Sequence, residues 1–328
     1  MRHPDHPPYR RRSSIILGSS VAALALALAS RARRARHPRE PLHGKVVVIT
    51  GASSGIGRAV AIECARRGAQ VVLAARHKDD LEAVAREVRE RGGEALVVPT
   101  DVREEEQVHR LVDQAVTRYG RLDVMFNHAG AWFIDSVEHS SLRRSRDLID
   151  LNVLGVLHGV QAALPVMRRQ GGGHIINTSS VEGRVSFPFT GVYAGTKAFV
   201  EALTQALRQE VMHLEKTGVK VSVLMPVTAR TPIFDKVPNI REGGRGAHLN
   251  QPVQEATDVA RAVVEAMEDY RPVILPFAPA QGLMTLYDLL PGLTNRLMTL
   301  VRVDKAASPL SDSRRGSHRE SRPIPPPA

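Results

Sequence analysis

The sequence predicts an α/β fold in which a single doubly wound parallel sheet is flanked by helices on both faces. Between residues 43 and 277, short apolar runs that are largely rich in β-branched residues alternate with longer, charged stretches of helical period. Strands of a parallel sheet are expected to be continuously apolar, because helices cover both of its faces. The sequence contains no internal repeat and no sign of a second core, so we expect one such sheet.

Each strand of this sheet is expected where a short apolar run occurs. The charged, periodic stretches over 79–91 and 104–118 are long enough to be the helices that cross from one parallel strand to the next. The strands are expected over Lys45–Thr50, Gln70–Ala75, Ala95–Pro99, Leu122–Asn127, His174–Thr178, Val219–Met225 and Pro272–Leu275.

The positive charge of the chain lies mostly at its two ends. The formal net charge is +11, of which residues 1–43 carry +7 and residues 304–328 carry +2, so residues 44–303 carry only +2. This distribution argues against a nucleic-acid partner, which would require a basic face on the folded domain. The single cysteine, Cys64, excludes an intrachain disulfide, and we interpret it as a small buried hydrophobe.

The first 43 residues combine an apolar stretch with two basic flanks. Ser13–Ser30 would form a helix of about 27 Å, close to the ~30 Å hydrocarbon core of a membrane. We predict a retained membrane anchor with the folded domain in the cytoplasm. An export signal is the alternative suggested by the Ala-Leu-Ala repeats, although the arginines at 31–36 resist translocation. A disordered start, which would leave the protein soluble in the cytoplasm, is the third interpretation.

The C-terminal region divides into two predicted parts. Residues 280–303 predict two short amphipathic helices separated at Pro291, which would cover a cleft, a subunit interface or a membrane surface. Residues 304–328 are poor in apolar residues and rich in Ser, Arg and Pro, so we expect a disordered tail. The predicted organisation is therefore an N-terminal segment over 1–43, a main domain over 44–279, the helices over 280–303 and the tail over 304–328.

A glycine-rich turn follows the first expected strand and leads into a helix. Its residues run from Gly51 through Ser53, Ser54, Gly55 and Ile56 to Gly57. Glycines let the chain turn sharply, and they bring backbone N–H groups against a pyrophosphate at a helix N-terminus. The context of strand, glycine turn and helix predicts a Rossmann-like dinucleotide site.

The end of the second strand indicates which dinucleotide binds. An acidic residue about 20 positions beyond the glycines would hold the ribose 2′-hydroxyl of NAD. This chain has Ala75 there, followed by Arg76, which can clamp a 2′-phosphate. We therefore expect NADP(H) as the cofactor.

The glycine spacing resembles the T-G-x-x-x-G-x-G motif of the short-chain dehydrogenase/reductase family, and further family motifs follow in order. The resemblance covers about residues 44–277. It implies an oxidoreductase that transfers a hydride between NADP(H) and a carbonyl or alcohol substrate. The matching residues are the adenine-contacting pair Asp101-Val102, Asn127-His128-Ala129-Gly130 for N-N-A-G, the helix residue Asn152, Ser180, Tyr193 and Lys197 for Y-x-x-x-K, and Pro226 to Thr231 for the carboxamide segment.

The resemblance assigns four catalytic residues. Tyr193 is the expected acid/base, and Lys197, one helical turn further on, brings a positive charge toward its phenol, whose ordinary pKa is about 10. The family roles of the others are to hydrogen-bond the substrate oxygen (Ser180) and to fix a water that links Lys197 to solvent (Asn152). The expected cofactor-binding residues are Gly51, Ser53, Ser54, Gly55, Ile56, Gly57, Arg76, Asp101, Val102, Asn127, Ala129, Gly130, Tyr193, Lys197 and Thr231, with no metal site.

Two departures from the family pattern stand out. His128 replaces the second Asn of N-N-A-G, which puts the hydrogen bonds of that residue in doubt, and Val227 replaces the Gly that usually follows the proline. A catalytically silent NADP(H)-sensing protein, or a membrane-associated adaptor, is the alternative function on the same fold. A missing Tyr or Lys would favour a silent protein, but both are present.

The substrate pocket is expected to include Trp132, Phe133, residues 186–189 and the loop over 232–252, which together suit a moderately apolar small molecule. Because the family is commonly dimeric or tetrameric, a homo-oligomer is also expected.

Overall fold

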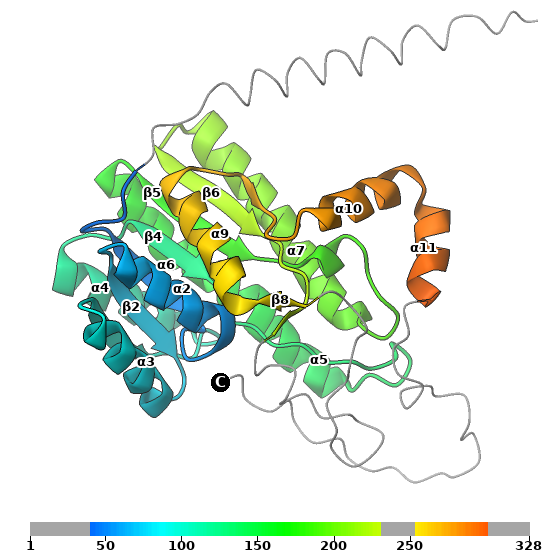
Figure 1. The fold of residues 1–328 in the computed structure, drawn as a ribbon, viewed down its shortest axis with the longest axis horizontal. Helices are drawn as coiled ribbons and strands as arrows, with labels where there is room; N and C mark the ends of the chain where they lie inside the picture. The colour runs from blue at the N-terminus through cyan, green and yellow to red at the C-terminus, as the bar shows by residue number, and fades with distance from the viewer. Residues whose placement is uncertain (1–39, 231–252, 301–328) are drawn as a thin grey trace, which may run out of the picture. The chain divides into compact units, whose positions relative to one another are not determined.

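The fold is built around seven parallel strands, seen in a computed structural model that describes residues 40–230 and 253–300. The strands lie in the order β3-β2-β1-β4-β5-β6-β9 (Figure 1). All seven expected strands are present, and the predicted parallel α/β fold is confirmed. The strands are β1 (Val46–Thr50), β2 (Gln70–Ala75), β3 (Glu94–Pro99), β4 (Val124–Asn127), β5 (Gly173–Thr178), β6 (Val219–Leu224) and β9 (Val273–Ile274).

The direction of winding reverses at β1. Val48 of this strand pairs with Val72 of β2 on one side and with Met125 of β4 on the other. In doubly wound sheets, ligands bind at such a switch point, outside the carboxyl ends of the strands. The loops after β1 and β4 therefore mark the place where a site is expected.

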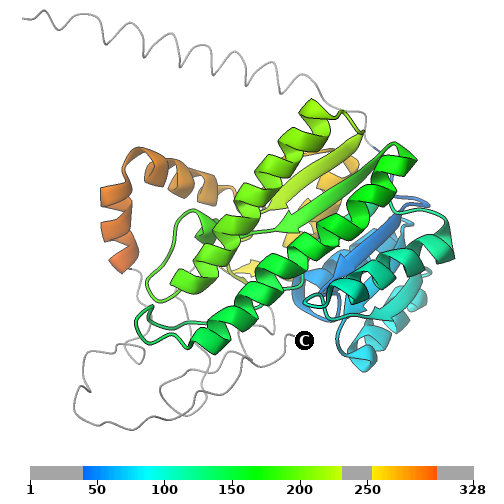
Figure 2. The same ribbon diagram turned by 180° about the vertical axis from the view of Figure 1, so that it is seen from behind.

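Helices cover both faces of the sheet, and the side chains of β1 alternate between them. Val47 and Ile49 pack in the core beneath α2 (Gly55–Arg66), α3 (Lys78–Glu90) and α9 (Ala256–Glu268), which lie in front in Figure 1. Val46 and Val48 pack in the opposite core. The helices of that face, seen from behind in Figure 2, are α4 (Glu105–Tyr119), α6 (Gly155–Gln170) and α7 (Gly191–Arg208).

A long helical stretch precedes β5. It consists of α5 (Leu142–Ile149), the π-helical η1 (Asp150–Leu154) and α6. Within the described ranges, this stretch is the one with the length and composition of a membrane span, and 61% of its most apolar window is buried inside the fold. It packs against the sheet and α4, so its apolar character is explained by the core. The anchor predicted over Ser13–Ser30 lies outside the described residues.

Short elements follow the main strands. They include η2 (Val181–Gly183), η3 (Gln209–Leu214), β7 (Ala229–Arg230) and β8 (Gln254–Glu255). Two helices occupy the segment where amphipathic helices were expected, and Pro291 separates them. They are α10 (Pro279–Leu289) and α11 (Pro291–Leu300). Met284 of α10 and Met298 of α11 join a third apolar cluster with Val181 and Met225.

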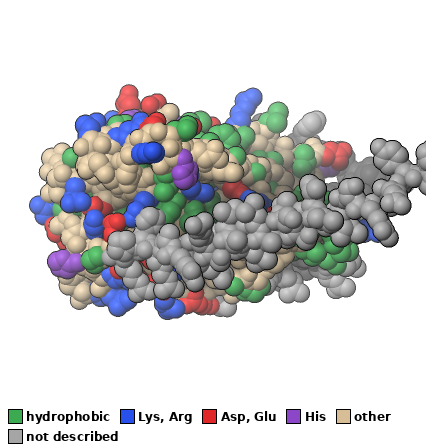
Figure 3. Space-filling model, turned by 90° about the horizontal axis from the view of Figure 1, so that it is seen from above, with side chains coloured by type: hydrophobic (Ala, Val, Ile, Leu, Met, Phe, Trp, Pro, Cys, Tyr) green, Lys and Arg blue, Asp and Glu red, His purple; other side chains and the backbone are tan. Residues whose placement is uncertain are grey.

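The charge of the described surface agrees with the sequence analysis, whereas the fold begins a few residues earlier than expected. Acidic and basic side chains are interspersed on the face shown in Figure 3, in keeping with the small net charge predicted for the main domain. Residues 40–43, which the sequence assigned to the N-terminal segment, are part of the fold, because Leu42 is buried and the Glu40 carboxylate lies 2.7 Å from Nζ of Lys220. The predicted tail over 304–328 lies outside the described residues.

Candidate active site

The glycine loop after β1 forms a tight cradle at the N-terminus of α2. Gly51 and Gly55 have φ angles of 70° and 54°, a region that favours glycine. A Cβ atom on Gly57 would lie 2.1 Å from the Gly51 carbonyl oxygen, so a side chain cannot fit there. The buried Ser53 hydroxyl has no hydrogen-bond partner among the described residues. A cradle of N–H groups with an unpartnered hydroxyl suits an anionic group such as a pyrophosphate.

Thr50 fastens this loop to the end of β4. Its Oγ1 accepts hydrogen bonds from the backbone N–H groups of His128, at 2.9 Å, and Ala129, at 3.1 Å. A Cβ atom on Gly51 would lie only 2.9 Å from the Ala129 Cα, which shows how closely the two loops approach. The predicted cofactor residues Asn127, Ala129 and Gly130 are therefore brought next to the glycine loop at the switch point.

The ends of β2 and β3 bring Arg76 and Asp101 into electrostatic contact. Arg103, which the sequence analysis missed, places its Nε 3.0 and 3.1 Å from the two carboxylate oxygens of Asp101. Although burial opposes the effect, hydrogen bonds from Arg103 hold the pKa of Asp101 below its ordinary value. Burial lowers the pKa of Arg76. The carboxylate beside Arg76 is thus already neutralised by a second arginine.

Tyr193 and Ser180 meet beyond the carboxyl end of β5. Tyr193 lies in the first turn of α7, and Ser180 lies two residues after the end of β5. Burial and the nearby Glu182 carboxylate raise the pKa of the Tyr193 phenol, whereas hydrogen bonding to Ser180 lowers it, and the net shift is upward. The positive charge expected from Lys197 therefore does not bring this pKa below its ordinary value in the protein by itself.

Lys197 is buried next to Tyr193. Its Nζ donates a hydrogen bond to the Thr178 carbonyl oxygen at 2.9 Å and lies 5.7 Å from the centroid of the Tyr193 ring. Burial lowers the pKa of Lys197 to about 8. This places a lysine that can lose or gain a proton near neutral pH beside the predicted acid/base.

Asn152 lies in the π-helical turn η1 and is completely buried. Its Oδ1 accepts from the backbone N–H of Ala131 at 2.9 Å, and its Nδ2 donates to the Ala131 carbonyl and to Oγ1 of Thr196. A Cβ atom on Gly130 would lie 3.0 Å from Oδ1 of Asn152 and 3.6 Å from Nζ of Lys197. The predicted residues Gly130, Asn152 and Lys197 therefore converge, and the water-holding role of Asn152 stays a prediction.

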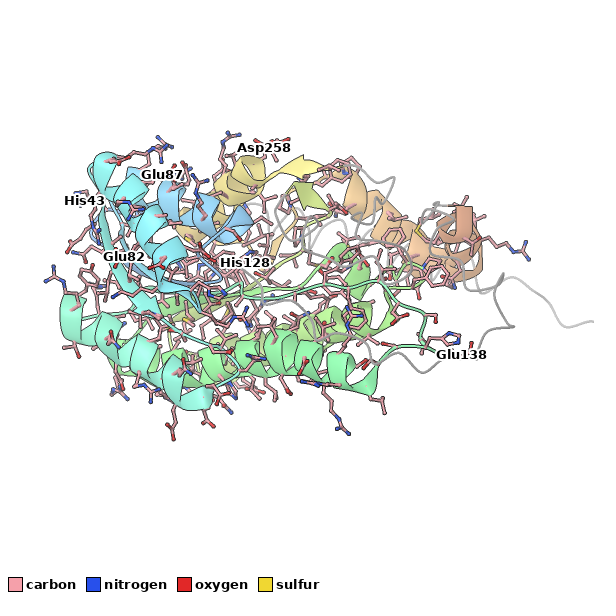
Figure 4. All side chains as sticks on the ribbon, turned by 90° about the horizontal axis from the view of Figure 1, so that it is seen from below. His43, Glu82, Glu87, His128, Glu138 and Asp258 are labelled. Atoms are coloured by element: carbon pink, nitrogen blue, oxygen red, sulfur yellow. The ribbon has the colours of Figure 1, made fainter. Side chains whose placement is uncertain are left out.

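His128 takes over a structural position between β4 and β5. Its ring stacks on Phe126, with 5.1 Å between centroids, and its Nδ1 lies 3.2 Å from Oγ1 of Thr178. Burial and the charge of Lys197 lower its pKa to about 3. Figure 4 shows His128 in the interior of the fold, whereas Glu138 and Asp258 lie at its surface. The family's Asn is thus replaced by a neutral ring bonded to the neighbouring strand.

Trp132 and Phe133, which the sequence predicts for the substrate pocket, lie within the described residues. Trp132 packs edge-on against Tyr193, with 6.5 Å between ring centroids, and the buried Arg144 guanidinium lies over Phe133. Sequence reasoning missed Arg144 and Glu182, because neither belongs to a motif. Thr231 and the loop over 232–252 lie outside the described residues. In the part of the chain that the structure describes, no three His, Cys, Asp or Glu side chains gather as a metal site would require.

Residues 45–241 match the family model of the short chain dehydrogenases, which is more than half of the chain. The chain belongs to this family. As a short-chain dehydrogenase it is an oxidoreductase, so the predicted family is confirmed. The roles assigned to individual residues are not tested by this match and stay predictions.

The chain is similar to several bacterial proteins of the same class. It is 40% identical over 194 residues to an uncharacterized oxidoreductase of Staphylococcus saprophyticus, which covers 59% of this chain and 77% of that protein. An uncharacterized oxidoreductase of Listeria innocua is 39% identical over 198 residues, covering 60% of this chain and 79% of that protein. These relatives support the reaction class without naming a substrate.

Solved structures of short-chain dehydrogenases share the fold. A short chain dehydrogenase/reductase from Burkholderia phymatum in complex with NAD is 32% identical, with a TM-score of 0.69 over 78% of this chain and 97% of that one. An alcohol dehydrogenase from the archaeon Thermococcus sibiricus, complexed with 5-hydroxy-NADP, is 29% identical, with a TM-score of 0.60 over 70% and 95% of the two chains. Similar proteins thus bind either type of nicotinamide dinucleotide.

Proposed function

We propose that this short-chain dehydrogenase transfers a hydride between NADP(H) and a carbonyl or alcohol substrate, with Tyr193 as the acid/base. The observation that carries the proposal is the meeting of Ser180, Tyr193 and Lys197 beyond the carboxyl end of β5, beside the glycine cradle at the switch point. A dehydrogenase needs these two parts together, since hydride transfer and proton transfer occur at one carbon–oxygen bond.

The cofactor residues fit a phosphorylated dinucleotide. The glycine cradle and the unpartnered Ser53 hydroxyl would hold the pyrophosphate, and Arg76 would hold the 2′-phosphate. Arg103 neutralises Asp101, so that carboxylate does not repel a phosphate beside Arg76. When bound, NADPH supplies the hydride.

Tyr193 is held in the protonated state that carbonyl reduction requires. Burial raises the pKa of its phenol, so the hydroxyl keeps its proton at neutral pH until negative charge develops on the substrate oxygen. Tyr193 Oη then donates this proton, and Ser180 Oγ donates a hydrogen bond to the same oxygen. The pKa of Lys197 is lowered by burial to about 8, and this residue would return a proton to the phenol through the water that Asn152 is predicted to fix.

An apolar substrate, a homo-oligomer and a membrane anchor are also part of the proposal. Trp132 and Phe133 support an apolar small-molecule substrate, because both are buried and Trp132 packs edge-on against Tyr193. Exposed Leu154, at the end of η1, and Phe199, on α7, support the expected homo-oligomer. The cytoplasmic location with a membrane anchor over Ser13–Ser30 stays a prediction.

Kinetics with both dinucleotides test this proposal. Purified full-length protein should oxidise NADPH in the presence of at least one member of a panel of ketones and aldehydes, with a lower KM for NADPH than for NADH. Arg76→Leu should raise the KM for NADPH roughly 10- to 100-fold, the value of a charge-assisted hydrogen bond of about 1.5–3 kcal/mol. The exposed Arg86 on α3 offers the control Arg86→Leu, which should leave KM unchanged. A wild-type preference for NADH, or an unchanged KM in Arg76→Leu, would contradict the cofactor assignment.

A further inference from the structure

Glu182 carries an unusual carboxyl group next to the active site. It lies in η2, two residues after Ser180, and is only 8% exposed. Its Oε2 has no hydrogen-bond partner among the described residues. A buried polar atom without a partner is costly, and native proteins keep such atoms where function requires them.

The backbone of Glu182 ties this residue to the substrate-binding side of the site. Its N–H donates a hydrogen bond to Oγ of Ser180 at 3.1 Å, the hydroxyl assigned to the substrate oxygen. Its carboxylate is close enough to Tyr193 to raise the pKa of the phenol. The carboxyl group is therefore near both groups that are expected to hold the reacting carbonyl.

Protein cations do not neutralise Glu182 within the described residues. Arg184, its neighbour in sequence, is paired with Glu201 at 2.7 Å and with Asp288 at 3.6 Å. Lys197 donates to the Thr178 carbonyl instead. Burial raises the pKa of Glu182 to about 7, against a lowering by hydrogen bonding to Thr190. The carboxyl group thus has capacity for a partner beyond those that the described residues provide.

We propose that Glu182 determines substrate specificity by accepting, at Oε2, a hydrogen bond from a hydroxyl or amino group close to the reacting carbonyl of the substrate. This inference rests on the proposed function, because it takes Ser180 and Tyr193 as the groups that bind the carbonyl oxygen. It narrows the substrate class to ketones or aldehydes that carry a hydrogen-bond donor, with Trp132 packing beside the same site.

Matched ketones and matched variants test the inference. Hydroxyacetone is compared with acetone, and benzoin with deoxybenzoin, so that each pair differs by one hydroxyl group. Glu182→Met keeps a side chain of similar length without a carboxylate, and we expect it to lower the ratio of kcat/KM within each pair about 10-fold or more. Glu210→Gln, at an exposed position in η3, is the control and should leave the ratio unchanged.

The pH dependence of the same ratio provides a second arm, which does not depend on the folding of the Met variant. Tyr193 on α7 interacts electrostatically with Glu182, Lys197 lies on the same helix, and Arg184 follows η2. The pKa of Glu182 is about 7, that of Lys197 is about 8 and that of Tyr193 is raised above its ordinary value, so Glu182 is the first of these to lose its proton as the pH rises through neutrality. The hydroxyl preference should grow as the pH rises through about 7, because ionisation makes the carboxylate a stronger acceptor, and Glu182→Gln should show no such growth.

Binding measured without turnover separates this inference from the proposed function. Trp132 is the one tryptophan of the chain, and its ring lies 6.5 Å from that of Tyr193, so its fluorescence should respond to ligands at the site. Hydroxyacetone should bind wild type at least about 10-fold more tightly than it binds Glu182→Met. Equal binding, or a kcat/KM ratio that neither variant changes, would overturn the role of Glu182. Selective binding without reduction of any ketone would instead contradict the proposed function.

Discussion

His128 shows how one substituted residue is accommodated at the centre of the site. Its neutral ring stacks on Phe126 and lies beside the Thr178 hydroxyl, while the carbonyl of the same Thr178 holds Lys197. Protonation of the ring would place a second positive charge near Lys197 in a buried environment. The replacement of Asn by His is therefore compatible with the fold as long as His128 remains neutral, which its pKa of about 3 ensures at physiological pH.

This arrangement predicts how stability depends on pH. The pKa of His128 is about 3 in the folded protein, below the value of about 6.5 of an unfolded chain. Neutral His128 therefore makes its full contribution to the free energy of unfolding above about pH 6.5. This contribution is lost as the pH falls toward 3, because only the unfolded state takes up the proton. When the pH is lowered from about 7 to 4.5, the urea concentration at the midpoint of unfolding should fall less for His128→Asn than for wild type.

The exposed His213 provides the control for this measurement, since His213→Asn should lose as much stability on acidification as wild type. His174 has the same lowered pKa and remains in every variant, so part of the acid sensitivity should persist in His128→Asn. Identical losses in His128→Asn and wild type would show that the ring is protonated in the folded protein.

Glycines in the helices of this protein differ sharply in the space around them. A Cβ atom on Gly57, at the start of α2, would collide with the Gly51 carbonyl oxygen, whereas a Cβ atom on Gly282, within α10, would meet nothing within 4 Å. Gly57→Ala should distort the cradle and weaken NADPH binding at least about 10-fold. Gly282→Ala should leave binding unchanged and stabilise the protein by up to about 1 kcal/mol through helix propensity. Titration of NADPH fluorescence and urea unfolding measure the two effects, and tight NADPH binding by Gly57→Ala would contradict the assignment of the cradle.

Helices and strands whose apolar residues recur with a clear period in the sequence could be predicted, whereas very short or irregular elements could not. The strand β2 occurs over the predicted residues, because its apolar, β-branched run is buried on both faces. Pro291 correctly indicated the break between α10 and α11. The two-residue strands β7 and β8 and the π-helical turn η1 have no sequence period that reveals them. Asn152 was still identifiable, because a polar residue in an apolar helical stretch signals a special role.

At the scale of the whole molecule, the order of motifs predicted which residues meet, and the structure adds the contacts between them. The motifs placed Ser180, Tyr193 and Lys197 in one site. They could not reveal that Arg103 neutralises Asp101, or that Glu182 faces Tyr193, since these depend on side-chain packing of residues outside the motifs. The small net charge of the folded body leaves the basic ends as separate features, and their function stays a prediction.

The proton donor is the central claim, and Tyr193→Phe tests it most directly. This variant removes only the phenolic hydroxyl, so the ring should still pack edge-on against Trp132. NADPH binding, followed by fluorescence, should match that of wild type, while kcat for the best ketone of the panel should fall about 10²- to 10⁴-fold, the contribution of a positioned proton donor. Near-normal turnover with intact NADPH binding would contradict the account.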